Sequence, residues 1–151
     1  MKSWKSLAGF LGVVFAVAMA GALAKPDAWY ASLAKPSFNP PAWVFAPVWT
    51  LLYIAIAIAG WRIYTRRGWD RSLSLWAMQL GLNGIWSPIF FGLHDITAAL
   101  CDIVLLLIAV VATAVAFFRR DRIAGGLMLP YSLWVAFATV LTASIWHLNT
   151  P

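Results

Sequence analysis

Residues 96–118 read ITAALCDIVLLLIAVVATAVAFF, and within this run only Asp102 carries a formal charge. A helix rises about 1.5 Å per residue, so the run is long enough to cross the roughly 30 Å hydrocarbon core of a bilayer. The whole chain is 63% hydrophobic and 11% charged, whereas soluble domains average about 45–50% and about 25%. A chain of 151 residues cannot bury that much apolar surface away from water, so the soluble globular and disordered classes of protein are excluded.

Four more apolar stretches lie on either side of this run, and each is long enough to span a bilayer. They cover residues 4–24, 42–64, 73–93 and 123–148. None alternates apolar and polar residues with the two-residue period of a transmembrane barrel strand. The sequence therefore predicts an all-α integral membrane protein, in which residues 1–151 form a single domain, a bundle of five transmembrane helices.

The basic residues indicate how these spans are oriented. Lys and Arg number 11 against 5 acidic residues, all of them Asp, for a net charge of +6. Most lie before the first stretch, between the second and third, and between the fourth and fifth, which share one side of the membrane if there are five spans. The other side holds only Lys25 and Lys35. Because cytoplasmic loops are enriched in basic residues, we expect a cytoplasmic N-terminus, a periplasmic first loop and C-terminus, and no nucleic-acid partner.

The first stretch has a second interpretation, as a secretory signal peptide. Lys2 and Lys5 precede it, and Ala22-Leu23-Ala24 has the A-x-A form of a cleavage site. The apolar run from Ser6 to Ala24 is longer than the roughly 7–15 residues usual for a signal peptide, and Pro26 would closely follow the cut. We expect a membrane span, with cleavage as the alternative. A basic N-terminus without a transit-like extension favours a bacterial inner membrane over an organelle.

Residues 25–41, KPDAWYASLAKPSFNPP, form the one long segment without a spanning pattern. Proline fixes the backbone and removes a hydrogen-bond donor, so the prolines mark stiff corners. Asp27 is placed to start a short helix over residues 27–33. The residues expected to shape a lid are Pro36, Phe38, Pro40 and Pro41. The segment is interpreted either as a lid over a cavity or as an aromatic belt at the membrane surface.

The third stretch has two distinct faces. Gln79, Asn83 and Ser87 recur every four residues and form one polar stripe. The opposite face carries, at the same spacing, Ala77, Gly81 and Ile85. Small residues let helices approach closely in lipid, so we expect this second face to meet another helix, in a homodimer. The polar stripe is expected inside the bundle, where hydrogen bonds to neighbouring helices are the simplest alternative to ligand binding.

The fifth stretch and the tryptophans indicate a site for flat ligands. Trp134 is followed one turn later by Ala138, which leaves a step on one helix face where a ring can lie; ordinary helix packing is the alternative. Of the 10 tryptophans, Trp49 and Trp86 also lie deep within their stretches. Indole rings in an interior suit flat aromatic ligands and cations.

Few residues offer other chemistry. Asp102 is a functional candidate because it is ionisable and lies within a span, although solvation or pairing near the membrane surface would also explain it. His94 and His147 are far apart in the sequence, and Cys101 has no partner cysteine. We therefore expect no metal site and no intramolecular disulfide.

Three motifs resemble the TspO/MBR family of tryptophan-rich sensory proteins, which is related to the mitochondrial translocator protein. They are Pro36-x-x-Asn39-Pro40-Pro41 with residues 43–53 (WVFAPVWTLLY), residues 79–92 (QLGLNGIWSPIFFG), and Pro130-Tyr131-x-x-Trp134-x-x-Phe137-Ala138-Thr139-x-Leu141. The resemblance extends over residues 25–148. It implies a bundle of five membrane helices, usually a homodimer, with an interior pocket that opens toward the first loop.

The resemblance also implies ligands and the residues that hold them. The family binds porphyrins such as protoporphyrin IX, isoquinoline and benzodiazepine-type drugs and, in many members, cholesterol; no cofactor is required. Carried over to this sequence, the ligand-binding residues are Trp29, Trp49, Tyr53, Asn83, Ser87, Trp134, Ala138 and Leu141. The sterol pattern near the C-terminus lacks its Tyr, and His147 stands where a basic residue is expected. We therefore do not expect specific cholesterol binding.

The expected function is porphyrin binding with a regulatory or sensory role in tetrapyrrole metabolism or the stress response. One alternative is a porphyrin transporter, although the sequence shows no inverted repeat. Another is an enzyme that degrades porphyrins in light. The resemblance implies this alternative because, in some bacterial members of the family, the tryptophans that match Trp29 and Trp134 are linked to light-dependent porphyrin breakdown.

Overall fold

The computed structural model describes residues 2–151, and the side chains from Ser3 onward. Its elements are α1 (Lys2–Leu23), α2 (Ala28–Ser32), α3 (Ala42–Arg67), α4 (Arg71–Ser87), a π-helix η1 (Pro88–Gly92), α5 (Ile96–Phe118) and α6 (Arg122–Asn149). No strand occurs among the described residues. The all-α prediction is confirmed, and the short helix expected within residues 27–33 is α2.

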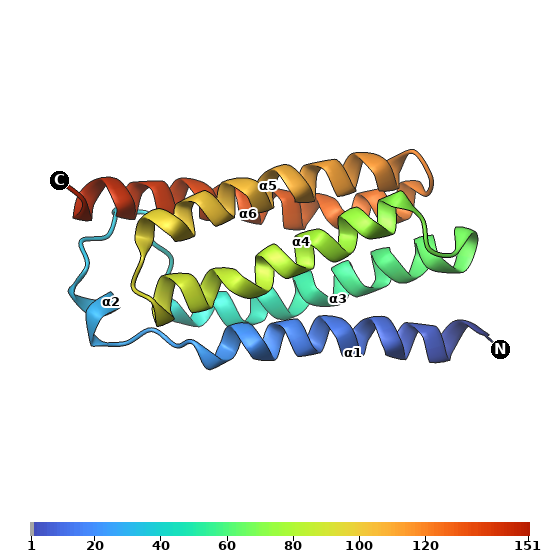
Figure 1. The fold of residues 1–151 in the computed structure, drawn as a ribbon, viewed down its shortest axis with the longest axis horizontal. Coiled ribbons are helices and arrows are strands. Elements are labelled where there is room, and N and C mark those ends of the chain that lie inside the picture. The colour runs from blue at the N-terminus through green and yellow to red at the C-terminus, as the bar shows by residue number, and fades with distance from the viewer. Residues whose placement is uncertain (1) are drawn as a thin grey trace.

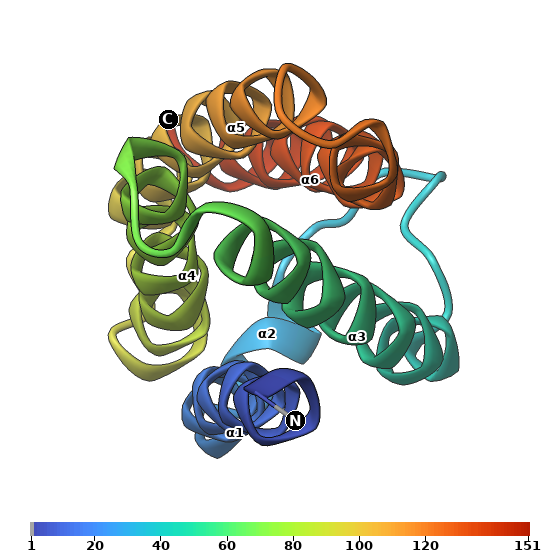
Figure 2. The ribbon, with the colours of Figure 1, turned by 90° about the vertical axis from the view of Figure 1, so that its right-hand side faces the viewer.

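The five long helices run along one axis (Figure 1). The N-terminus lies at one end of the bundle, whereas α2 and the C-terminus lie at the other, which we call the lid end. An end-on view shows α1 beside α3 and α4, with α5 and α6 on the far side of the bundle (Figure 2). Only Val14 of the described part of α1 is buried, so this helix covers the bundle from outside.

Four helices are long and apolar enough to cross a membrane: Ser3–Leu23, Ala42–Arg67, Ile96–Phe118 and Arg122–Asn149. The third predicted span differs, because α4 ends at Ser87 after 17 residues. The chain continues directly from α4 into η1. At Pro88 the missing N–H interrupts the α-helical bonding pattern, and the Leu93 N–H bonds to the Pro88 carbonyl at 2.9 Å, five residues back. Two other prolines, Pro47 and Pro130, lie inside α3 and α6 without ending either helix.

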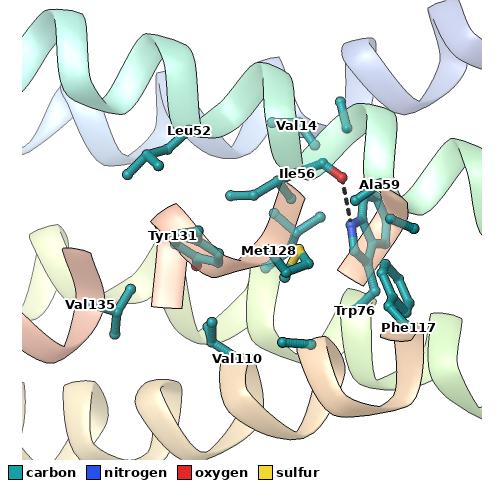
Figure 3. Close-up of a cluster of buried hydrophobic side chains, with 14 of the residues drawn as sticks. Val14, Leu52, Ile56, Ala59, Trp76, Val110, Phe117, Met128, Tyr131 and Val135 are labelled. Carbon is teal, nitrogen blue, oxygen red and sulfur yellow. Dashed lines mark hydrogen bonds between the residues drawn. The ribbon is translucent and has the colours of Figure 1, made fainter. Parts of the chain in front are cut away.

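A continuous hydrophobic core joins the long helices. Trp76 of α4 is buried beside α3 and donates its indole N–H to the Ile56 carbonyl at 3.0 Å (Figure 3). Its ring lies so close to Gly60 that a Cβ atom there would come within 2.6 Å of it. Tyr131 and Met128 of α6 are fully buried in the same core. This core therefore packs α3, α4 and α6 against one another, and aromatic residues fill the lid end.

Aspartates begin four of the helices. Asp27, Asp70, Asp95 and Asp121 precede α2, α4, α5 and α6, and each accepts at least one backbone N–H from the first turn. Such caps satisfy N–H groups that have no partner within the helix. Asp121 also pairs with Arg62 at 2.9 Å and with Arg66 at 3.4 Å. The cap of α6 is therefore joined to the end of α3.

We expect Asp121→Asn to lower stability by about 1–2 kcal/mol at neutral pH, because the charged bonds to Arg62 are lost. Burial raises the pKa of Asp121, but Arg62 and the Ile123 and Ala124 N–H groups outweigh it and hold the pKa below its usual value. The carboxylate therefore stabilises the fold above the ordinary Asp pKa, and this contribution is lost as the pH falls through the lowered value.

Thermal unfolding in detergent, measured from pH 7 to pH 3, checks this prediction. The wild type should unfold at a higher temperature than Asp121→Asn at pH 7, and the gap should close at acid pH. A gap that stays constant over this range would contradict the proposed role of the charge.

Candidate functional site

A cluster of aromatic rings fills the lid end between α3 and α6. Trp49 lies 5.2 Å from Tyr53 and 6.4 Å from Trp134, measured between ring centroids, with the two indole planes at 88°. Trp134 also contacts Phe45 and Phe137, at 5.9 and 5.5 Å. Ala138 packs at the edge of the same core. The structure therefore brings Trp49 and Tyr53 of α3 together with Trp134 of α6, and Ala138 lies one turn along α6 from Trp134. We call these rings the inner cluster.

A second set of rings, the outer cluster, joins the lid to η1. Phe90 is buried and stacks on Trp86 at 5.0 Å and 19°. Trp29 of α2 meets Phe90 edge-on at 5.7 Å. Leu141 of α6 is buried in the same group. Two of the predicted ligand residues, Trp29 and Leu141, thus lie in the outer cluster, together with Trp86.

Two members of the predicted polar stripe, Gln79 and Asn83, belong to a hydrogen-bond chain across three helices, whereas Ser87, also expected inside the bundle, lies beside α1. The Tyr53 hydroxyl donates to Asn83 Oδ1 at 2.8 Å, and Asn83 Nδ2 donates to the Tyr131 hydroxyl at 2.8 Å. The Tyr131 hydroxyl donates to Gln79 Oε1 at 2.7 Å. Gln79 and Asn83 are 0% and 7% exposed. The expectation that these two side chains face the interior is confirmed, and both Asn83 polar atoms bind tyrosines.

Some buried polar atoms at this end have no partner among the described residues. They include the indole nitrogens of Trp86 and Trp134, and Gln79 Nε2 at the end of the chain just described. A buried N–H without an acceptor is destabilising. Such groups in an aromatic surrounding are available to a ligand that brings acceptor atoms.

The lid is held to the bundle at two places. The Asn149 amide pairs with the Ala34 backbone, donating to its carbonyl at 2.8 Å and accepting from its N–H at 2.9 Å. On the other side Asp27 pairs with His94 Nε2 at 2.9 Å, and the His94 ring stacks on Trp29 at 4.2 Å. The Tyr30 N–H, together with His94, holds the pKa of Asp27 below its usual value against the opposing effect of burial. His94 has a positive φ of 56°, a conformation uncommon outside glycine.

The prolines of the lid extend this contact along α6. Phe38 meets Phe137 edge-on at 6.2 Å, and Pro36 borders a surface hollow of about 570 Å³ beside His147 and Val140. Pro36 and Pro40 are half-buried, and Pro41 directly precedes α3. The segment therefore contacts both aromatic clusters, through Phe38 and through Trp29.

These features match one family model. The TspO/MBR family model fits residues 10–147. The chain belongs to the TspO/MBR family. It is 40% identical over 146 residues to the tryptophan-rich sensory protein of Cereibacter sphaeroides, covering 97% of this chain and 92% of that protein. It is 43% identical to the tryptophan-rich protein TspO of Chlorobaculum tepidum, covering 95% and 96%. It is also 40% identical to the human translocator protein, covering 80% and 75%.

The remaining predicted residues of this TspO/MBR chain lie on the α1 side of α4. Ser87 lies near α1, since its hydroxyl is 3.9 Å from the Cβ position of Gly21. Gly81 and Ile85 are exposed, whereas Ala77 is half-buried and packs against the core. A hollow of about 490 Å³ runs along this small-residue face between α1 and α4, lined by Ala77, Gly81 and Phe10 among others. Part of this face therefore lies opposite α1 of the same chain.

Sequence reasoning missed the partners that hold the site together. Tyr131 belongs to one of the three motifs, but the resemblance does not assign it to the ligand site. In the structure it links Asn83 to Gln79. Asn149 and His94 hold the lid but carry no periodic pattern. Only their amide and imidazole groups at the ends of apolar stretches could have indicated them.

Proposed function

We propose that the protein binds flat tetrapyrroles of the porphyrin class at the lid end, between Trp134 and Ala138 of α6 and the facing helices α3 and α4. The observation that carries the proposal is the inner cluster, where rings from α3 and α6 surround the buried indole N–H of Trp134, which has no partner among the described residues. Aromatic walls favour a flat ring, and the unpaired N–H favours a ligand with carbonyl or carboxylate groups. Isoquinoline and benzodiazepine-type compounds meet the same requirements.

We further propose a sensory or regulatory role, as the names of the bacterial relatives suggest. In this proposal α4 and η1 together cross the membrane as the third span in chain order, which brings the number of spans to five. The N-terminus is cytoplasmic, and the first loop and C-terminus are periplasmic in a bacterial inner membrane. Two copies associate through Ala77, Gly81 and Ile85. No cofactor is needed for binding.

Titration with protoporphyrin IX tests the proposed site. We expect Ala138→Phe to weaken binding at least about tenfold, because the new ring fills the step beside Trp134. Val140→Phe is the matched control, since this residue of the same helix is 57% exposed and should bind normally. Tryptophan quenching in the dark measures the affinity. Equal affinity of wild type and Ala138→Phe would remove this binding mode.

The same titration under illumination separates binding from catalysis. Stable porphyrin absorption bands would favour a sensor or carrier, and liposome flux of the porphyrin would then test transport. Light-driven loss of the bands, faster than for free porphyrin and dependent on Trp29 and Trp134, would replace the sensory proposal with a degrading enzyme.

A further inference from the structure

Asp102 differs from every other acidic residue of the chain. The other four aspartates accept backbone N–H groups at the start of a helix. Asp102 instead lies within α5 and is 6% exposed. No hydrogen bond or ion pair joins it to another described residue, and its Oδ2 atom is buried without a partner. A buried, unpaired carboxyl group destabilises a fold, so the fold itself does not require it.

Contacts between α5 and α6 place Asp102 at the level of the proposed site. The two helices run in opposite directions (Figure 1), and near the lid end Trp146 donates its indole N–H to Thr97 Oγ1 at 3.0 Å. Asp102 lies five residues after Thr97, and Leu141 lies five residues before Trp146. Asp102 and Leu141 are therefore at about the same height along the bundle. Ala138 lies one turn further along α6.

The buried polar atoms without partners in this part of the bundle include both a hydrogen-bond acceptor and hydrogen-bond donors. Asp102 offers an acceptor, whereas Trp86 and Trp134 offer indole N–H donors, and all three atoms are buried without partners. Trp86 packs against both hydrophobic clusters, so it lies where the inner and outer groups of rings meet. A ligand that is flat and aromatic, and that carries both N–H and oxygen groups, fits this combination.

We propose that Asp102 is a ligand-binding residue whose carboxyl group accepts a hydrogen bond from an N–H group of a flat heteroaromatic ligand. The pyrrole N–H groups of a free-base porphyrin point to the centre of the macrocycle, so the carboxyl group would accept from one face of the ring. The assignment rests on the proposed function, because it requires that the aromatic clusters hold such a ligand. It adds a polar contact on α5 to a site otherwise built from α2, α3, α4 and α6.

Two variants and two probes test the assignment in the full-length protein. Asp102→Asn keeps the shape but removes the charge, and Asp102→Leu removes the acceptor. We expect Asp102→Leu to weaken protoporphyrin IX binding at least about tenfold, and Asp102→Asn to have a smaller effect. Pyrene, a flat hydrocarbon without an N–H group, should bind wild type and both variants within about twofold.

The ligand-free proteins provide a second readout. Asp102→Leu should unfold at a higher temperature than the wild type, because it removes an unpaired buried polar group. A structural role would instead lower both the melting temperature and the affinities for both probes, and would overturn the assignment. Unchanged porphyrin binding in both variants would overturn it as well. Failure of the wild type to bind protoporphyrin IX would overturn the proposed function and this assignment with it.

Discussion

Gly125→Ala is expected to destabilise the folded protein by about 2 kcal/mol. An added Cβ atom would lie 2.4 Å from Cγ and 2.7 Å from Cα of Phe118. The ring can rotate away because Phe118 is exposed, but its Cα belongs to the end of α5 and cannot move without shifting the turn into α6. Overpacking of this kind costs about 1–3 kcal/mol, which outweighs the roughly 1 kcal/mol that alanine gains over glycine inside a helix.

The neighbouring Gly126 supplies the control. Nothing lies within 4 Å of a Cβ atom built there, so Gly126→Ala should gain helix propensity without a clash and raise stability by up to about 1 kcal/mol. The two variants have the same composition and differ by one position. We expect their melting temperatures in detergent to differ by about 5–10 °C, and equal values would show that α5 and α6 can separate freely at this turn.

The fold could be predicted from the sequence because the length of each apolar stretch and the turn residues beside it determine where a helix begins and ends. The run at residues 96–118 became α5 with the same bounds, and the other long helices differ from the predicted stretches by a few residues at their ends. The exception is the third stretch, whose last part is the π-helix that follows Pro88. Proline predicts an interruption of the helix, but not that the backbone widens into a π-helix there.

The site could be predicted only in part, because residue spacing gives the face of a helix but not its partners. The four-residue spacing of Gln79 and Asn83 correctly placed them inside the bundle. It could not show that Tyr131 would lie between them, since that depends on how α6 is rotated against α4. The same limit applies to Trp29, because the position of α2 depends on contacts such as that between Asp27 and His94.

Tyr131→Phe is expected to cost about 2–3 kcal/mol, although it removes a single oxygen atom. The hydroxyl accepts from Asn83 Nδ2 and donates to Gln79 Oε1, and Tyr131 is fully buried. The variant leaves both amide groups without a partner at these atoms, and a buried unsatisfied group costs about 1–3 kcal/mol. Because phenylalanine keeps the ring, the core packing does not change, and the loss measures the hydrogen bonds alone.

Tyr53→Phe is the matched control, because the Tyr53 hydroxyl makes only the bond to Asn83 Oδ1 at the start of the chain. Tyr53 is half-buried, so its loss should cost about 1 kcal/mol or less. Adding Gln79→Leu to Tyr131→Phe should recover part of the lost stability, because replacing both partners by apolar groups leaves fewer unpaired atoms. Chemical or thermal unfolding of the three variants measures these differences. If Tyr131→Phe destabilises the protein no more than Tyr53→Phe does, the amide groups must find other partners, and Asn83 would then be free to contact a ligand. If Tyr131→Phe is the more destabilising variant, Asn83 acts chiefly by holding α4 against α3 and α6 beneath the aromatic site.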